Sequence, residues 1–396
     1  MAGPDTAALA AEARRGGRLA IDTEFMTEGR YVPLLCLVQV AVDAPEGGVR
    51  TELLDPLAGF DPAPLAGVLA DPDIEVVLHA ARQDVGILRR EWRTEVTRVF
   101  DTQVAAGFAG FSAQAGYGNL LADALGITSS KSAGFTRWDV RPLTQEQLSY
   151  ARGDVDLLLQ LASFLQERLH ARGRLEWVRD ECRALESSNL QRDPEEAWRR
   201  LPRVHQLSGR ARAVARELAA WRERTALAED KPVGSIVADA PLVELARRQP
   251  SDLRELEQVR GLHPRGLRRR GPALLEAVAR GREGAPPPLD GDRPPPSDPA
   301  DAPVIALGEA LLRQRALEAG VAYEVLAARA DLTRIVSAAR RGEPEPEVRT
   351  IRGWRREVVG AELLALLEGG RRLGVDGSGR VTVEPGRCET PAKRTS

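Results

Sequence analysis

The chain is short of cysteine, of aromatic side chains and of long apolar stretches, and each shortage narrows what it can be. Its three cysteines are scattered without metal-ligand spacing, which argues against a disulfide framework or a zinc site and suits a reducing compartment. No run of about 18 apolar residues occurs, and residues 1–22 lack the apolar core of a signal peptide. We therefore expect a cytoplasmic protein with no membrane partner.

Several common catalytic patterns are also missing. The sequence has no P-loop, no Gly-x-Gly-x-x-Gly after a strand and no evident Ser–His–Asp arrangement. Aromatic residues make up only 4% of the chain, so extensive stacking on nucleic-acid bases is not predicted. Charge is unevenly spread: residues 1–205 hold 30 acidic and 23 basic side chains, a net charge of −7, whereas residues 206–283 hold 11 and 16, a net charge of +5. An acidic part joined to a basic part suits an enzyme that acts on nucleic acid.

Strand-like and helix-like segments alternate in residues 1–205. Short apolar runs predict strands at 18–21, 34–42, 51–54 and 74–79. Helical periodicity covers 83–92 and 144–169. The alternation predicts an α/β layer, and the short connections between the early strands predict that these strands are antiparallel.

From residue 206 the strand signals stop, and the sequence predicts helices only. Residues 206–283 and 303–375 each begin with a long amphipathic helix, followed by a polar turn, a short helix started by Asp and a Gly-interrupted segment before a last helix. This repetition predicts two copies of one all-α module. Residues 284–302 form a proline-rich tether that cannot build a core, and residues 376–396 are expected to be a disordered tail.

Acidic residues in three separated motifs are the main chemical signal. Asp22 and Glu24 are two apart at the end of the first predicted strand, so both side chains point to one face of the sheet. Asp84 falls in the first turn of the helix that follows the strand at 74–79. Tyr150 and Asp154 are four apart on a helix and therefore share a face. Taken alone, each motif fits an ordinary acidic turn, a favourable helix start or a packed aromatic residue equally well or better.

The combination points to metal-dependent chemistry. Mg²⁺ prefers oxygen ligands, and two such ions about 3.5–4 Å apart can clamp both reacting oxygens of a phosphoryl transfer. Crowded carboxylates repel one another, so the site needs cations to form. His79 precedes Asp84 by five residues, and we interpret it as a satisfied core or strand-end histidine rather than a metal ligand.

The order of these motifs resembles the ribonuclease D family. The resemblance rests on Asp22-Thr23-Glu24-Phe25, on the segment 31–39, on His79 and Asp84, and on the segment 141–154 with Tyr150 and Asp154. That family belongs to the DEDD exonucleases, in the subclass with tyrosine in the third motif. Residues 206–283 resemble its HRDC helical domain, and residues 303–375 resemble a more divergent copy. The match covers roughly 15–205 for the catalytic part, and the set of motifs is more specific than any one of them.

The resemblance implies a ribonuclease H-like α/β exonuclease domain over residues 1–205, followed by two all-α HRDC-type domains. It implies 3′→5′ hydrolysis of RNA to nucleoside 5′-monophosphates, with tRNA precursors carrying 3′ extensions and other small structured RNAs as substrates. By matching position, Asp22, Glu24, Asp84 and Asp154 would bind two divalent cations, Mg²⁺ or Mn²⁺. Tyr150 would orient the attacking water. A monomer is expected.

Candidate RNA contacts are less specific. Phe25 and Met26 could pack on the terminal base, although Phe25 fits an apolar core equally well. Lys131 could contact a phosphate or be solvated. Arg265, Arg268 and Arg269 lie in a basic segment of the first helical module, where phosphate contacts would add affinity without sequence specificity. Two alternatives to an exoribonuclease remain: a 3′→5′ DNA exonuclease, because the cations do not read the sugar, and a non-catalytic RNA-binding protein.

Overall fold

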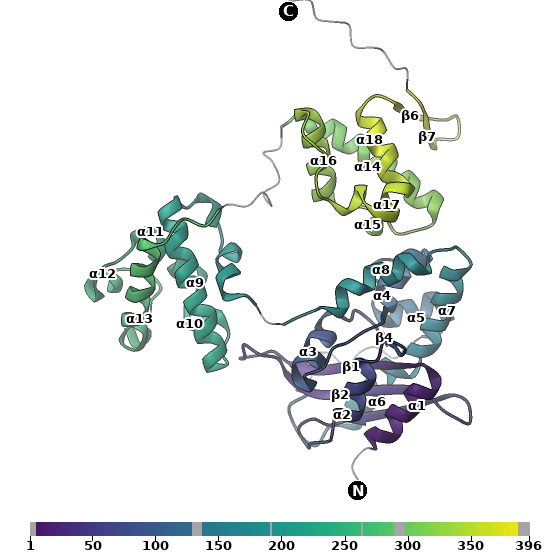
Figure 1. The fold of residues 1–396 in the computed structure, drawn as a ribbon, viewed down its shortest axis with the longest axis horizontal. Helices are drawn as coiled ribbons and strands as arrows, with labels where there is room; N and C mark the ends of the chain where they lie inside the picture. Colours follow the sequence, from purple (N-terminus) through teal and green to yellow (C-terminus); the bar gives the residue numbers. More distant parts are fainter. Residues whose placement is uncertain (1–4, 129–136, 191, 263, 289–297, 387–396) are drawn as a thin grey trace, which may run out of the picture.

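The computed structural model describes residues 5–128, 137–190, 192–262, 264–288 and 298–386 (Figure 1). Residues 5–190 form an α/β part, as the alternation of sequence patterns predicts. Its elements are α1 (Thr6–Gly16), β1 (Arg18–Met26), β2 (Leu34–Asp43), β3 (Val49–Leu54), α2 (Ala63–Leu69), β4 (Glu75–Leu78), α3 (Arg82–Trp92), β5 (Val99–Asp101), α4 (Thr102–Ala109), α5 (Tyr117–Leu125), α6 (Gln145–Asp156), α7 (Leu158–His170) and α8 (Leu175–Glu186).

The five strands form one mixed sheet in the order β3-β2-β1-β4-β5. β1 and β2 are antiparallel, as are β2 and β3, which confirms the orientation predicted from their short connections. β4 runs parallel to β1, and β5 runs parallel to β4. β5 was not predicted, because its three residues are too few to show a period. The predicted helix over 144–169 is two helices, α6 and α7, which meet at Leu157.

Helix α6 lies across β1, β2 and β3, while α1 packs against β1 and β2. β1 is therefore a central strand covered by helices, and its apolar residues Leu19, Ala20 and Ile21 are fully buried. This burial fixes the register of β1, since a slip by one residue would turn Asp22 and Glu24 to the other face.

The first helical module contains α9 (Gly209–Glu229), α10 (Val233–Ile236), α11 (Asp239–Arg248), α12 (Leu253–Glu257) and α13 (Pro264–Glu283). Two 3-10 turns, η1 (Pro194–Arg200) and η2 (Val204–Gln206), precede it. Their residues Trp198, Leu201 and Val204 belong to the apolar core of the helical module. The packing therefore groups 194–205 with the helices, whereas the predicted boundary lies at 205.

The second helical module contains α14 (Asp301–Ala319), α15 (Tyr323–Leu326), α16 (Arg329–Arg341), η3 (Arg349–Ile351), α17 (Gly353–Arg355), η4 (Arg356–Gly360, a π-helical turn) and α18 (Ala361–Leu367). It repeats the order of the first: a long helix, a single-turn helix, a medium helix, a short turn and a last helical segment. The two modules lie on different sides of the α/β part (Figure 1).

Two features differ from the sequence expectations. The last helix ends at Leu367, just before Gly369 and Gly370, whereas the sequence predicts only helices up to 375. β6 (Arg371–Val375) follows and pairs with β7 (Val381–Pro385) as an antiparallel hairpin. Part of the predicted disordered tail therefore forms a strand, stabilised by cross-strand hydrogen bonds that its polar composition does not reveal. Residues 387–396, and 289–297 of the predicted tether, lie outside the described residues. Among the described residues no helix is both long and apolar enough to cross a membrane.

Candidate active site

The site is built at the end of β1. Asp22 and Glu24 are both half-buried and point to the face of the sheet that α6 covers, as their spacing of two predicts. Next to Glu24 the pairing with β2 shifts by one residue, which marks a bulge where the strand leaves the regular ladder. The apolar residues 19–21 thus anchor a rigid strand, and the two carboxylates sit where it approaches the surface.

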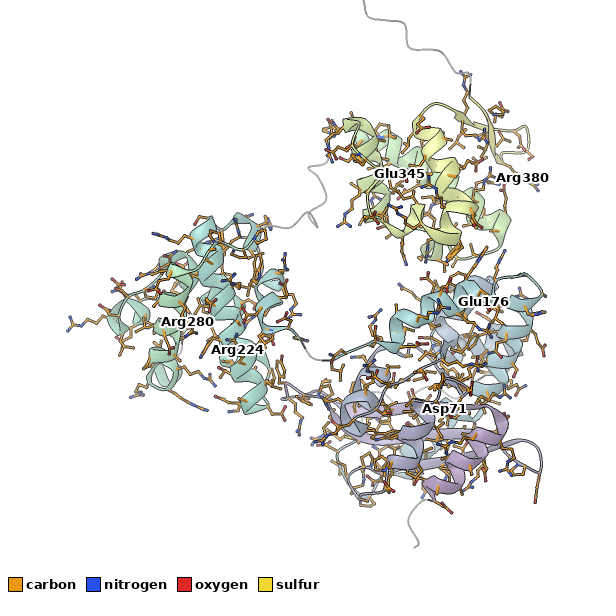
Figure 2. The ribbon with its side chains drawn as sticks, viewed as in Figure 1. Asp71, Glu176, Arg224, Arg280, Glu345 and Arg380 are labelled. Carbon is orange, nitrogen blue, oxygen red and sulfur yellow. The ribbon has the colours of Figure 1, made fainter. Side chains whose placement is uncertain are left out.

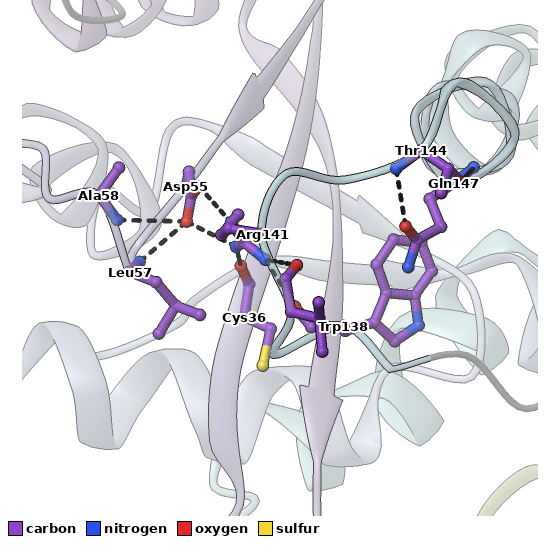
Figure 3. Close-up of polar contacts among 9 residues, drawn as sticks. Cys36, Asp55, Leu57, Ala58, Trp138, Arg141, Thr144 and Gln147 are labelled. Carbon is purple, nitrogen blue, oxygen red and sulfur yellow. Dashed lines mark hydrogen bonds and ion pairs between the residues drawn. The ribbon is translucent and has the colours of Figure 1, made fainter.

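Helix α6 supplies the third carboxylate, Asp154. Ligand oxygens of Asp22, Glu24 and Asp154 all lie within 4.8 Å of one another. The helix begins at a capping box: the Thr144 hydroxyl accepts from the Gln147 amide, and the Gln147 side chain accepts from the Thr144 amide (Figure 3). This cap fixes the start of α6, nearly three turns before Asp154.

The segment entering α6 is held by Arg141. Its guanidinium binds both oxygens of Asp55 at 2.6 and 2.7 Å, and it donates to the carbonyls of Trp138 and Cys36 (Figure 3). A bidentate arginine–carboxylate pair adds geometric specificity as well as energy. Arg141 therefore ties the start of α6 to β2, the neighbour of the strand that carries Asp22 and Glu24.

Asp84 approaches from α3, in the first turn, where the sequence placed it. It is 7% exposed, and its carboxylate accepts a hydrogen bond from the Thr23 hydroxyl. Thr23 lies between Asp22 and Glu24 and faces the other side of β1. Residues 22–24 therefore carry two acidic residues of the site and hydrogen-bond to a third, Asp84. Asp84 is not one of the three carboxylates within 4.8 Å of one another, but its charge acts on both Asp22 and Glu24.

The electrostatics of the site favour cations. Burial, followed by repulsion from Asp84, Asp154 and Glu24, raises the pKa of Asp22 well above its ordinary value. Burial and then the other carboxylates raise the pKa of Glu24 to about 8. Burial raises the pKa of Asp154 to about 7 and that of Asp84 to about 6. These acids repel one another when ionised, so a divalent cation among them relieves the repulsion, and the donor set of oxygen ligands fits Mg²⁺ or Mn²⁺.

Tyr150 lies one helical turn before Asp154 on the same face of α6. Burial, and then the negative charge of the nearby Asp154 carboxylate, raises the pKa of the Tyr150 hydroxyl above its ordinary value. Its ring packs near Trp138, with ring centroids 6.1 Å apart. The hydroxyl oxygen can still accept a hydrogen bond, for example from a water molecule.

These elements agree with three comparisons to known proteins. Residues 5–170 match the family model described as 3′-5′ exonuclease, and residues 211–278 match the HRDC domain model. The chain is 39% identical over 376 residues to a ribonuclease D from Gluconacetobacter diazotrophicus, covering 92% of this chain and 91% of that one. It is 38% identical to a ribonuclease D from Granulibacter bethesdensis, covering 94% and 93%.

The chain belongs to the ribonuclease D family. A solved structure supports the same assignment: Escherichia coli RNase D superposes with a TM-score of 0.78 at 30% identity, covering 92% of this chain and 96% of that one. That protein is described as an exoribonuclease involved in structured RNA processing. This chain therefore has the ribonuclease H-like exonuclease fold together with an HRDC domain. Its enzyme type is a 3′-5′ exoribonuclease.

Two other residues near the site make contacts of their own. His79 follows β4 and is half-buried beside Tyr117, and its Nδ1 lies 2.9 Å from the Thr102 hydroxyl. Its Nε2 has no hydrogen-bond partner among the described residues, so the expectation of a fully satisfied histidine is wrong. Asp156 is exposed and accepts from the Thr51 hydroxyl at 2.6 Å, so it points away from Asp154.

The candidate RNA-contacting residues differ in how exposed they are and in which partners they have. Phe25 is half-buried against the main core, and Met26 is 8% exposed in a small apolar cluster with Trp138, so Met26 presents little surface to a base. Arg268 is exposed, and Arg269 pairs with Glu229 at 2.7 Å beside a cavity of about 450 Å³ in the first module. Lys131 and the Arg265 side chain lie outside the described residues. Figure 2 shows Arg224 and Arg280 as further cations on this module, each paired with a carboxylate.

Sequence reasoning missed two supporting contacts of the ribonuclease D site. The Thr23–Asp84 bond joins residues 61 apart in the chain, and nothing in the sequence pairs them. The Arg141–Asp55 pair is equally long-range. In contrast, the Thr144–Gln147 capping box follows a recognisable Thr-x-x-Gln pattern and could have been predicted.

Proposed function

We propose that this member of the ribonuclease D family hydrolyses RNA from the 3′ end and releases nucleoside 5′-monophosphates with the help of two divalent cations, Mg²⁺ or Mn²⁺. The proposed substrates are tRNA precursors with 3′ extensions and other small structured RNAs. The observation that carries the proposal is the gathering of Asp22, Glu24 and Asp154 oxygens within 4.8 Å, with Asp84 beside them. A monomer in the cytoplasm is the proposed working form.

In this proposal Asp22, Glu24, Asp84 and Asp154 would hold the cations, which would supply charge stabilisation for an in-line phosphoryl displacement. The chain itself contributes geometry. β1 and α6 present their carboxylates from rigid elements, Thr23 orients Asp84, and Arg141 fixes the approach to α6. The Tyr150 hydroxyl, which shares a face of α6 with Asp154, would accept a hydrogen bond from the attacking water and aim it at the scissile phosphate.

The basic first module is proposed to hold the RNA upstream of its 3′ end. Phosphate contacts from Arg268 and Arg269 would supply affinity that does not depend on sequence and that weakens with salt. The second module carries 12 basic and 10 acidic residues over 303–375, a net charge of +2, so it gives less electrostatic support for RNA binding.

The test is a magnesium-dependent time course on a 5′-labelled tRNA precursor with extra 3′ nucleotides. The wild type should shorten it stepwise from the 3′ end. Asp22→Asn removes a ligand charge, and a loss of about 4 kcal/mol of transition-state stabilisation lowers the rate roughly 10³-fold. RNA binding and thermal unfolding should stay near wild type. Tyr150→Phe should slow single-turnover cleavage far more than it weakens binding.

The matched control is Asp156→Asn, which neutralises an exposed carboxylate two residues from Asp154 and should cleave at the wild-type rate. Matched RNA and DNA oligomers with free 3′ ends complete the design. Faster digestion of DNA than of RNA would replace the proposal with a DNA exonuclease. Binding of RNA without any shortening would indicate a non-catalytic RNA-binding protein.

A further inference from the structure

Gln39 is an anomaly in the middle of β2. It is 0% exposed, and it sits between the fully buried Val38 and Val40. Neither its amide nitrogen Nε2 nor its carbonyl oxygen Oε1 has a hydrogen-bond partner among the described residues. A buried amide left without partners costs about 1–3 kcal/mol, whereas an apolar residue of the same shape would cost nothing. A packing role alone therefore does not explain a glutamine here.

The register of the sheet places Gln39 at the candidate metal site. Gln39 lies directly opposite Asp22 in the antiparallel β1–β2 pair. Directly opposed residues project to the same face with Cβ atoms about 4.5–5.5 Å apart, so a glutamine side chain can reach an aspartate oxygen across the pair. On the other side of Gln39 the register partner is Leu53 of β3, which offers no polar side-chain atom.

This face of the sheet is covered by α6, the helix that brings Asp154. Leu37, Leu53 and Ala151, which line the same region, form an apolar cluster. Asp22 is thus the polar side chain paired with Gln39 across the strands. The two carboxylate oxygens of a metal-binding aspartate have different partners. An oxygen that binds a cation is fixed by it, while the second oxygen needs a hydrogen-bond donor to set the plane of the carboxylate.

We propose that Gln39 is a positioning residue whose Nε2–H donates to the Asp22 carboxylate when the site holds divalent cations. A neutral amide suits this task, because it orients the carboxylate without cancelling the negative charge that attracts the cations, as a lysine or arginine would. The role rests on the proposed function, since it assumes that Asp22 is a metal ligand.

The experiment measures metal affinity directly, without RNA, by titration calorimetry with MnCl₂ and with MgCl₂. Gln39→Met keeps the length and volume of the side chain and removes both polar atoms. We expect its affinity for the cations to fall about 10-fold, as is usual when a partner of a metal ligand is removed. Its thermal unfolding in EDTA should occur at or above the wild-type temperature, because an unpaired buried amide is gone.

Two further variants sharpen the result. Gln39→Asn keeps the amide but shortens its reach, so it should lose affinity as Gln39→Met does. Ser188→Ala removes a buried hydroxyl, beyond the end of α8, that has no hydrogen-bond partner among the described residues, and it should leave affinity unchanged. Affinity of Gln39→Met within twofold of wild type would overturn the proposal and leave glutamine as a packing residue.

A measurement on the unaltered chain covers the case in which these variants do not fold. In a nitrogen-15-labelled sample, the Gln39 side-chain amide signals should shift on addition of MgCl₂ and exchange slowly with solvent. Signals that stay unmoved at saturating Mg²⁺ would contradict the proposed bond. If the wild type itself binds no divalent cation, the metal site of the proposed function fails, which is a different outcome from a wild type that binds while Gln39→Met binds equally well.

Discussion

The two helical modules share an order of helices, yet they are attached to the α/β part in opposite ways. The second module continues the main apolar core. Trp354 stacks on Trp177 with ring centroids 4.7 Å apart, and Phe108 meets its edge at 5.1 Å. Leu311, Leu332 and Leu363 from the module belong to the same buried cluster as the strands of the sheet.

Backbone contact reinforces this attachment. The Ala322 amide donates to the Gly107 carbonyl at 2.8 Å, and a Cβ on Gly107 would lie 2.7 Å from a methyl of Val325. Glycine is therefore required at this crossing of α4 and α15. Buried Arg355 adds a bond to Glu181 of α8 at 2.6 Å.

The first module has its own core and is joined through a clasp, which we define as Arg30, Tyr31 and Val32 with Glu223 and Asp230. The clasp is mostly polar, and the Tyr31 ring packs against the core of the module. Asp230, the residue that caps α9, pairs with Arg30 at 2.7 Å and accepts from the amides of Tyr31 and Val32. The Tyr31 hydroxyl donates to buried Glu223 at 2.6 Å. The clasp holds the loop that follows β1, six to eight residues beyond Glu24.

Two modules with the same order of helices are therefore attached to the α/β part through different kinds of contact. Apolar aromatic burial gives the second module a large, permanent contact, whereas hydrogen bonds and ion pairs at a partly exposed clasp exchange with water and contribute less. The module with the greater positive charge is the one that is attached through the clasp.

The largest effect should come from the aromatic contact. Trp354→Ala empties a buried site between two rings and should lower the free energy of unfolding by about 3–5 kcal/mol. Urea denaturation followed by circular dichroism measures this. Trp354→Phe, which keeps part of the packing, should cost less. A wild-type urea midpoint for Trp354→Ala would mean that the second module is not held by this contact.

A smaller effect is expected at the clasp. Asp230→Ala removes one ion pair and two charge-assisted bonds and should cost about 1–2 kcal/mol. Hydrogen exchange should quicken at the Tyr31 and Val32 amides, while the Ala322 amide in the second module stays protected. Glu244→Gln, which removes a carboxylate paired with Arg248 inside the first module, serves as control. Faster exchange at Ala322 in Asp230→Ala would break the distinction between the two attachments.

The smallest effect concerns pH. Partial burial, and then the bond to Glu223, raises the pKa of Tyr31 to about 12. Because this folded-state value lies above the unfolded value near 10, the contribution of Tyr31 is complete below about pH 10 and is lost as the pH rises towards 12. The difference in tyrosinate absorbance between wild type and Tyr31→Phe should show a midpoint near 12. A midpoint near 10 would indicate that Tyr31 is solvated and that the clasp lacks this bond.

Much of the catalytic part could be predicted from local pattern. Three of its features are short-range: side chains two residues apart in β1 share a face, Tyr150 and Asp154 are four apart on a helix, and a helix starts near Asp84. Periodicity is sufficient to assign which of these side chains share a face. The strand β5 and the hairpin β6–β7 escaped prediction, because short strands are stabilised by their partners in the sheet rather than by their own residues. The buried position of Met26 likewise depends on Trp138, which is distant in sequence.

The sequence by itself determined the functional groups available to this protein: carboxylate oxygens as ligands, no metal-binding set of cysteines, and a tyrosine one helical turn from an aspartate. It also determined that two similar series of helices follow the catalytic part. Only the tertiary structure decided that three carboxylates converge, that Gln39 faces Asp22, and that one module shares the main core while the other is held by a clasp. The reason is that periodicity is local, whereas contacts between residues 60 to 200 apart depend on how buried surfaces pack, and one chain's composition fits many packings.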